Sequence, residues 1–216
     1  MIKAILFDLD GVLIETEKET FQFYQNYLKD KGIHLKDSDF KYKAGRKSKD
    51  FWNDVLTPQQ QKEVNVKKLT ELKRKLFNAQ PQKYVTKVNG GKELLETLKN
   101  NGYRLALVSQ NESQMINSMI NWLEIKKYFD TIVSIDDITN LKPDPEIYLL
   151  AAKKLKVNPS ECIAIEDSKD GVGSVKNANI KCIGIKHDFT PEGDINRADI
   201  VLNKLTEINL DLIKKL

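Results

Sequence analysis

Between residues 89 and 202 the chain alternates short apolar runs with amphipathic helical segments, and this alternation constrains the fold more than any other feature. The apolar runs are short and are bounded by glycine or polar residues, so they are predicted to be strands. Strands that alternate with helices form a parallel sheet whose two faces are covered by the helices. The predicted fold class is therefore α/β, with a doubly wound, Rossmann-like parallel sheet. The predicted strands after the first are 103–109, 131–135, 162–166, 181–185 and 199–202.

A further apolar run starts at Ala4 and stops on two carboxylates, Asp8 and Asp10, followed by Gly11. Period-two alternation places Asp8 and Asp10 on the same side of a strand, and the glycine lets the chain turn away. Carboxylates this close repel each other, so either a cation lies between them or one of them holds a proton. The structural alternative is that the two acids only end the strand and cap the segment that follows.

The segment 15–85 differs in character from the rest of the chain. Phe21 and Tyr24 begin a helical spacing of apolar residues, and no convincing strand follows before residue 85. We therefore expect a core of residues 1–14 and 86–216 that is interrupted by an all-helical insertion at 15–85. Because the insertion leaves the core directly after the two carboxylates, we expect it to lie over them.

Composition limits the possible functions. The 216 residues are 40% hydrophobic and 31% charged, which suits a soluble domain with a sizeable core. The net charge of +4 is mild and interspersed with acids, so it does not support a nucleic-acid partner. No apolar run is long enough to span a bilayer, and the chain goes straight into the first strand, which leaves no room for a signal peptide. A cytoplasmic location without membrane partners is therefore expected. Cys162 and Cys182 lie in apolar runs and are expected to be buried thiols.

Polar residues end the strands at one predicted edge of the sheet, where parallel sheets bind ligands. These residues are Asp8, Asp10, Ser109, Glu166 and Asp167, with Lys142 just ahead of a helix that is predicted from Pro143 to Lys156, with proline in its first turn. Asp8, Glu166, Asp167 and the backbone carbonyl of Asp10 offer hard oxygen ligands, which suit Mg²⁺ and argue against zinc.

Phosphate chemistry is consistent with this set of residues. A cation, the Lys142 ammonium group and donors around Ser109 would offset the charge of a phosphate beside Asp8. An aspartate can attack the phosphoryl group, and a second acid can protonate the leaving alkoxide and later deprotonate a water. Asp10 is placed two residues after Asp8 for that second task.

The motifs resemble the four motifs of the haloacid dehalogenase (HAD) superfamily in type, order and context. They are Asp8-Leu-Asp10-Gly11-Val12, Ser109, Lys142-Pro-Asp-Pro-Glu-Ile-Tyr148, and Ile165-Glu-Asp-Ser168 followed by Gly171. Within that superfamily the chain resembles the phosphatase and beta-phosphoglucomutase-like branch, whose helical cap is inserted directly after the first motif. True dehalogenases lack the second aspartate of the first motif, so Asp10 implies phosphate esters as substrates.

The resemblance also implies roles for individual residues. Asp8 would be the nucleophile and Asp10 the general acid and base. Ser109, the amide of Gln110 and Lys142 would hold the phosphate, and Asp8, Asp10, Glu166 and Asp167 would surround Mg²⁺. The cap arginine of beta-phosphoglucomutases has only approximate counterparts here, Arg46 or Lys47.

The sequence thus predicts an Mg²⁺-dependent phosphatase, a monomer or weak dimer, that hydrolyses a small phosphomonoester such as a sugar phosphate through an aspartyl-phosphate intermediate. The first alternative is a beta-phosphoglucomutase-like sugar-phosphate mutase, but those enzymes carry a histidine where this chain has Thr20. The second alternative is a non-catalytic phosphate-binding regulator, which would not require Asp10.

Overall fold

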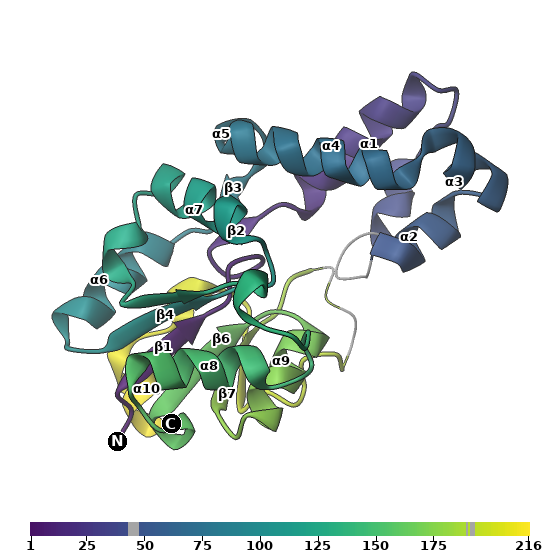
Figure 1. The fold of residues 1–216 in the computed structure, drawn as a ribbon. Helices are drawn as coiled ribbons and strands as arrows, with labels where there is room; N and C mark the ends of the chain where they lie inside the picture. Colours follow the sequence, from purple (N-terminus) through teal and green to yellow (C-terminus); the bar gives the residue numbers. More distant parts are fainter. Residues whose placement is uncertain (43–47, 189, 191–192) are drawn as a thin grey trace. The chain divides into compact units, whose positions relative to one another are not determined.

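The chain divides into two compact units in the computed structural model, which describes residues 1–42, 48–188, 190 and 193–216 (Figure 1). The core unit comprises Met1–Glu15 and Lys87–Leu216, and the helical unit comprises Thr16–Thr86. Each unit has its own cluster of buried apolar side chains. The units are therefore described one at a time.

A six-stranded parallel sheet forms the centre of the core unit, with the strand order β5-β4-β1-β6-β7-β8. The strands are β1 (Ala4–Phe7), β4 (Arg104–Val108), β5 (Thr131–Val133), β6 (Cys162–Glu166), β7 (Lys181–Ile185) and β8 (Ile200–Leu202). β1 lies between β4 and β6, and all four of its residues are fully buried. The predicted α/β fold class is confirmed, and the carboxyl end of β1 lies between those of its two neighbours.

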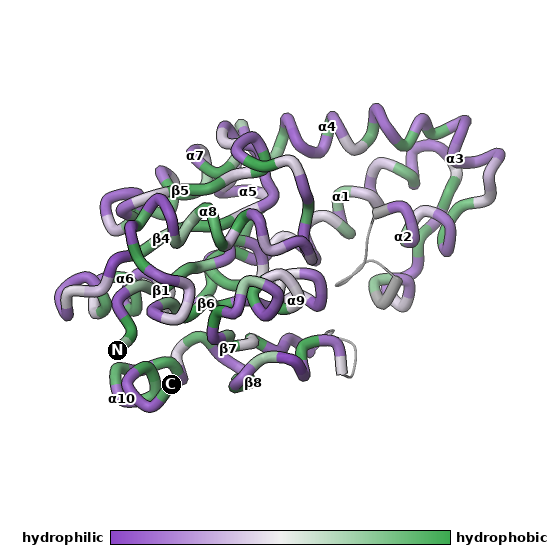
Figure 2. The backbone as a smooth tube through the Cα atoms, turned by 60° about the horizontal axis from the view of Figure 1, so that its bottom comes forward, coloured by the Kyte–Doolittle hydropathy of each residue, from purple (hydrophilic) through white to green (hydrophobic). Residues whose placement is uncertain are grey.

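Both faces of the sheet are covered. Leu6 of β1 and Val108 of β4 belong to a cluster with residues of α8 (Glu146–Leu155) and α9 (Lys169–Asn177), which pack on one face. The alternate residues Ile5, Phe7 and Leu107 are also fully buried, so the opposite face is covered as well. α6 (Gly91–Asn100) packs against β4, and α7 (Ser113–Trp122) and α10 (Leu210–Lys215) complete the helices of this unit. Figure 2 shows that the central strands are largely apolar along their length.

Short elements connect the longer ones. Among the described residues of the core unit, 3₁₀ helices lie at Lys126–Tyr128, Ile135–Asp137, Pro159–Glu161 and Leu205–Glu207. A separate two-stranded sheet pairs β2 (Ile14–Glu15) with β3 (Thr86–Lys87), where the chain passes between the two units.

The helical unit contains α1 (Glu17–Lys29), α2 (Ser48–Val55), α3 (Pro58–Val64), α4 (Val66–Ala79) and α5 (Pro81–Tyr84), with a 3₁₀ helix at Asp37–Tyr42. Aromatic rings form its core: the ring centroid of Trp52 lies 4.7 Å from those of Tyr24 and Phe51. α4 alternates polar and apolar residues along its length, as expected for an amphipathic surface helix (Figure 2).

One predicted boundary was wrong for a clear physical reason. The helix predicted from Pro143 to Lys156 begins only at Glu146, so neither Pro143 nor Pro145 lies within its first turn. A residue that precedes a proline avoids helical backbone angles, which keeps Asp144 out of the helix. The Asp144 carboxylate instead accepts a hydrogen bond from the Glu146 backbone N–H at 2.9 Å.

Within the residues that the structure describes, no helix has both the length and the apolar character needed to cross a membrane.

Replacing Leu6 by alanine should lower the free energy of unfolding by about 2–5 kcal/mol, because Leu6 is fully buried in the central strand and the variant leaves a cavity. Leu149→Ala on α8 is the matched control, since that leucine is 39% exposed and its loss should cost about 0.5 kcal/mol or less. Urea denaturation of both variants measures the difference. Equal losses would contradict the central position of β1 in the core.

Candidate active site

The carboxyl end of β1 turns sharply after Asp8. The Asp8 backbone N–H continues the pairing with β6 by donating to the Ile165 carbonyl at 3.0 Å. Gly11 has a φ of +73°, which favours glycine. A Cβ built on Gly11 would lie 1.9 Å from Oδ2 of Asp167, so glycine is also required for space. The turn therefore brings the first motif directly against Asp167.

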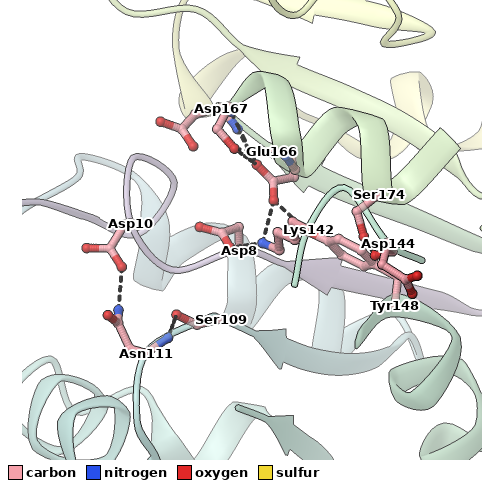
Figure 3. Close-up of polar contacts among 12 residues, drawn as sticks. Asp8, Asp10, Ser109, Asn111, Lys142, Asp144, Tyr148, Glu166, Asp167 and Ser174 are labelled. Carbon is pink, nitrogen blue, oxygen red and sulfur yellow. Dashed lines mark hydrogen bonds and ion pairs between the residues drawn. The ribbon is translucent and has the colours of Figure 1, made fainter. Parts of the chain in front are cut away.

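Lys142 joins two buried carboxylates. Its Nζ lies 2.6 Å from Oδ1 of Asp8 and 2.6 Å from Oε1 of Glu166, and its side chain is only 6% exposed (Figure 3). Salt screens buried ion pairs much less than surface pairs. Removing one member of such a group leaves an uncompensated buried charge, which is strongly destabilising. Lys142 thus links the ends of β1 and β6.

Glu166 is completely buried, and five donors hold its carboxylate. Oε1 accepts hydrogen bonds from Lys142 Nζ and from the Tyr148 hydroxyl at 2.8 Å. Oε2 accepts from the backbone N–H of Asp167, the backbone N–H of Ser168 and the Ser168 hydroxyl. A carboxylate has about four lone-pair positions, so these donors fix Glu166 in one orientation.

The pKa values of three carboxyl groups of the site are shifted in different directions. Burial raises the pKa of Asp8 to about 8; Lys142 opposes this, and Glu166 and Asp10 add to it. Burial also raises the pKa of Asp167 well above its usual range, with further contributions from Glu166 and Asp8. For Glu166 burial acts in the same direction, but Lys142 and the other donors outweigh it and lower its pKa. One lysine therefore does not neutralise the acids, and the site favours an additional cation or proton.

A divalent cation fits these residues. Carboxylate oxygens of Asp8, Glu166 and Asp167 lie within 4.8 Å of one another. All are hard oxygen donors, and the pKa values of Asp8 and Asp167 are raised first by burial and then by neighbouring carboxylates, whose charge a bound cation would offset. These three side chains are the ones that would hold the ion.

Asp10 and Ser109 lie at the β4 side of the site (Figure 3). Oδ2 of Asp10 accepts a hydrogen bond from Asn111 Nδ2 at 2.5 Å. Ser109 is 2% exposed, and its Oγ accepts a hydrogen bond from the Asn111 backbone N–H at 3.2 Å. The Gln110 side chain presents a buried Nε2 with no hydrogen-bond partner among the described residues. This edge of the site therefore carries hydrogen-bond donors next to an acid.

The structure brings most of the predicted site residues to one edge of the sheet. Asp8 and Asp10 follow β1, Ser109 and Gln110 follow β4, Glu166 and Asp167 lie at the end of β6, and Lys142 precedes α8. Arg46 and Lys47 lie outside the described residues. Thr20 lies on α1 of the helical unit and is 2% exposed.

Three site residues were not predicted. Asn111 holds Asp10, and Tyr148 holds Glu166. His187 follows β7, and its Nε2 lies 2.9 Å from the Gly11 carbonyl and 3.5 Å from Oδ2 of Asp167. The rule that polar residues follow strand ends could have found Asn111 and His187, whereas nothing in the helical spacing around Tyr148 indicates where its hydroxyl points.

Residues 5–185 match the family model described as haloacid dehalogenase-like hydrolase. The chain is 31% identical over 219 residues to the phosphorylated carbohydrates phosphatase of Thermotoga maritima, and the match covers 99% of each chain. It is similar to the structure of CbbY from Rhodobacter sphaeroides in complex with phosphate, with a TM-score of 0.76, 25% identity and 96% of each chain covered. It is also similar to the beta-phosphoglucomutase of Clostridium difficile, with a TM-score of 0.73 and 25% identity over 100% of this chain and 96% of that one.

The raised pKa of Asp8 predicts how stability depends on pH in the presence of a chelator. Because the pKa of about 8 in the folded state exceeds the usual value near 3.9, the protonated carboxyl stabilises the fold at low pH. That contribution is complete below about pH 4 and is lost progressively as the pH rises to about 8. The free energy of unfolding of the wild type should therefore fall relative to that of Asp8→Asn across this range.

Urea denaturation of both proteins with EDTA measures this difference. Magnesium chloride should stabilise the wild type more at pH 8 than at pH 6, because the cation competes with the proton for the same carboxylate. A difference between wild type and variant that does not change with pH would contradict the raised pKa.

Replacing Gly171 by alanine should displace Glu166, because the new Cβ would lie 2.0 Å from its Cδ and from Oε1. We expect a loss of about 1–3 kcal/mol in the free energy of unfolding, even though alanine favours helices. The matched control on the same helix is Gly173→Ala, whose nearest neighbour is Pro143 Cβ at 3.1 Å. Thermal unfolding compares the two. Equal stability of both variants would mean that Glu166 is not held rigidly.

Proposed function

Because the chain belongs to the haloacid dehalogenase-like hydrolase family, we propose that it is a magnesium-dependent phosphatase that hydrolyses a small phosphorylated metabolite through an aspartyl-phosphate intermediate. The observation that carries the proposal is the pairing of Asp8, at the end of the central strand, with Lys142 at 2.6 Å. A relative that acts on phosphorylated carbohydrates supports a sugar phosphate or a similar metabolite as the substrate.

In the proposed first step, a carboxylate oxygen of Asp8 attacks the phosphorus in line with the ester oxygen. A P–O bond to Asp8 forms while the P–O bond to the alcohol breaks, and Asp10 donates a proton to the departing oxygen. In the second step Asp10 takes a proton from a water that attacks the aspartyl phosphate. Inorganic phosphate leaves and free Asp8 is regenerated, so the two acids return to their initial states.

The other residues bind and neutralise the phosphate. The ammonium group of Lys142, the Ser109 hydroxyl and the Gln110 amide would contact the phosphoryl oxygens. Mg²⁺ held by the side chains of Asp8, Glu166 and Asp167 and by the backbone carbonyl of Asp10 would offset the charge that accumulates on those oxygens. The hydrogen bond from Asn111 would keep the Asp10 carboxylate at a fixed position beside the leaving oxygen.

We propose that the helical unit, inserted between the first and second motifs, acts as a cap that selects the substrate. This corresponds to the insertion at 15–85 in a core of residues 1–14 and 86–216. A cap that closes over a site excludes bulk water and bulky esters, which favours a small metabolite. Arg46 and Lys47 are the proposed cap residues for substrate contact.

Similarity to a beta-phosphoglucomutase favours a sugar-phosphate mutase as the second candidate. A mutase would return the phosphoryl group from Asp8 to a second hydroxyl of the sugar instead of to water. The residue at the position of the mutase cap histidine is Thr20, whose side chain lacks a base of suitable pKa. Hydrolysis therefore remains the preferred proposal.

Replacing Asp8 by asparagine should lower kcat/KM for phosphate release by about a thousandfold or more, because the nucleophile is lost. Wild type and variant are assayed with sugar phosphates, phosphoglycolate, nucleoside monophosphates and an aryl phosphate, with magnesium and with EDTA. Asp211→Asn, which changes an exposed aspartate on α10, is the matched control and should retain full activity.

Other results of this assay would redirect the proposal. The protein would be a mutase if it releases phosphate from none of these esters but converts beta-glucose 1-phosphate in the presence of a bisphosphate primer. Asp10→Asn separates an enzyme from a binding protein, since an enzyme loses turnover whereas a binder keeps its phosphate affinity. Hydrolysis by Asp8→Asn at the wild-type rate would contradict the aspartyl-phosphate mechanism.

A further inference from the structure

We propose that Tyr148 is a positioning residue for the phosphate site: it holds Lys142 between Glu166 and Asp8, so that the ammonium group faces the substrate phosphate. This inference rests on the proposed function, since it concerns the same site. Tyr148 lies on α8, and among the described residues its hydroxyl donates a hydrogen bond to Glu166 and not to Asp8. It would act only through its two charged neighbours.

Tyr148 contacts both of those neighbours. Its hydroxyl donates a hydrogen bond to Oε1 of Glu166 at 2.8 Å, the oxygen that also accepts from Lys142. The centre of its ring lies 5.1 Å from Nζ of Lys142, within the range of a cation–π interaction (Figure 3). A single side chain therefore orients the acceptor through its hydroxyl and attracts the ammonium group through its ring.

Packing alone does not explain a tyrosine at this position. Tyr148 is fully buried in the apolar cluster that includes Ala151 and Ala164. A phenylalanine would fill the same volume without the cost of burying a hydroxyl. The hydroxyl is instead used as a donor, in the hydrogen bond of 2.8 Å to Oε1 of Glu166.

The shared oxygen explains the expected effect. Oε1 of Glu166 accepts hydrogen bonds from both Lys142 and the Tyr148 hydroxyl. Lys142 also forms an ion pair with Asp8 at 2.6 Å. Without the tyrosine hydroxyl, Oε1 would interact more strongly with Lys142 and draw the ammonium group toward Glu166. The phosphate beside Asp8 would then lose part of its interaction with the lysine, because charge-assisted hydrogen bonds depend strongly on distance.

The test compares Tyr148→Phe, which keeps the ring, with Tyr148→Leu, which loses both ring and hydroxyl. Binding of inorganic phosphate in the presence of magnesium is measured by titration calorimetry, and kcat and KM are measured with an aryl phosphate. We expect Tyr148→Phe to weaken phosphate binding about tenfold, and Tyr148→Leu to weaken it further. Tyr24→Phe is the matched control, since it removes the hydroxyl of a buried tyrosine in the helical unit, and it should leave phosphate affinity unchanged.

A double-mutant cycle distinguishes positioning from general destabilisation. If the hydroxyl acts through Glu166, adding Tyr148→Phe to Glu166→Gln should change phosphate affinity by less than about twofold. Independent effects that multiply in the double variant would overturn the inference. If Glu166→Gln does not fold, the ¹⁵N resonance of the Lys142 ammonium group replaces the cycle. It should shift in Tyr148→Phe and not in Tyr24→Phe, and an unchanged resonance would overturn the inference.

The inference and the proposed function can fail separately. Phosphate binding by Tyr148→Phe that equals that of the wild type overturns the inference and leaves the hydrolase intact. A wild type that binds phosphate but hydrolyses no ester overturns the proposed hydrolase, and a tenfold loss of phosphate affinity in Tyr148→Phe would still support the role of Tyr148.

Discussion

The buried interaction of Lys142 with Asp8 and Glu166 is the constraint on which the rest of the site depends. Two carboxylates share one ammonium group at 2.6 Å each, almost out of contact with solvent. The effective cost of burying each charge is several kcal/mol, so the arrangement persists only where additional hydrogen bonds compensate for the lost water. The five donors around Glu166 provide that compensation, and Asp8 retains the unbalanced charge that a cation or proton must meet.

The surrounding backbone allows the acids of the site to lie close together. Gly11 leaves room for the carboxylate of Asp167, and Gly171 leaves room for that of Glu166. A Cβ at either glycine would lie 2.0 Å or less from the carboxylate and would clash with it. The sheet order places β1 between β4 and β6, so the acids at the ends of β1 and β6 lie close enough for Lys142 to contact both. Strand order and close packing thus bring the acids together, and the segments that follow the strands or precede α8 supply the other site residues.

The sequence was sufficient to predict the parallel sheet and the residues at its carboxyl edge, because strand burial and the polar residues after each strand are local patterns. It was not sufficient for the contact of Tyr148, which ends the third motif, because nothing in the sequence shows that its hydroxyl reaches Glu166 on another element. Asn111 and His187 follow strands as well, but only the three-dimensional structure shows that they contact Asp10 and Gly11. α8 begins only at Glu146 because Asp144 precedes a proline and avoids helical backbone angles. The spacing of apolar residues does not indicate such a local restriction of the backbone.

The placement of β1 beside β4 and β6 also has a consequence for the order of events during folding. The first strand pairs with segments that lie about one hundred and about one hundred and sixty residues later in the chain. Contacts of such high sequence separation form slowly, because a long stretch of chain must first be ordered. During synthesis Asp8 emerges long before Lys142 and Glu166, so the nascent chain carries the first motif without its partners. The chemistry of the protein is thereby delayed until almost the whole core has been made.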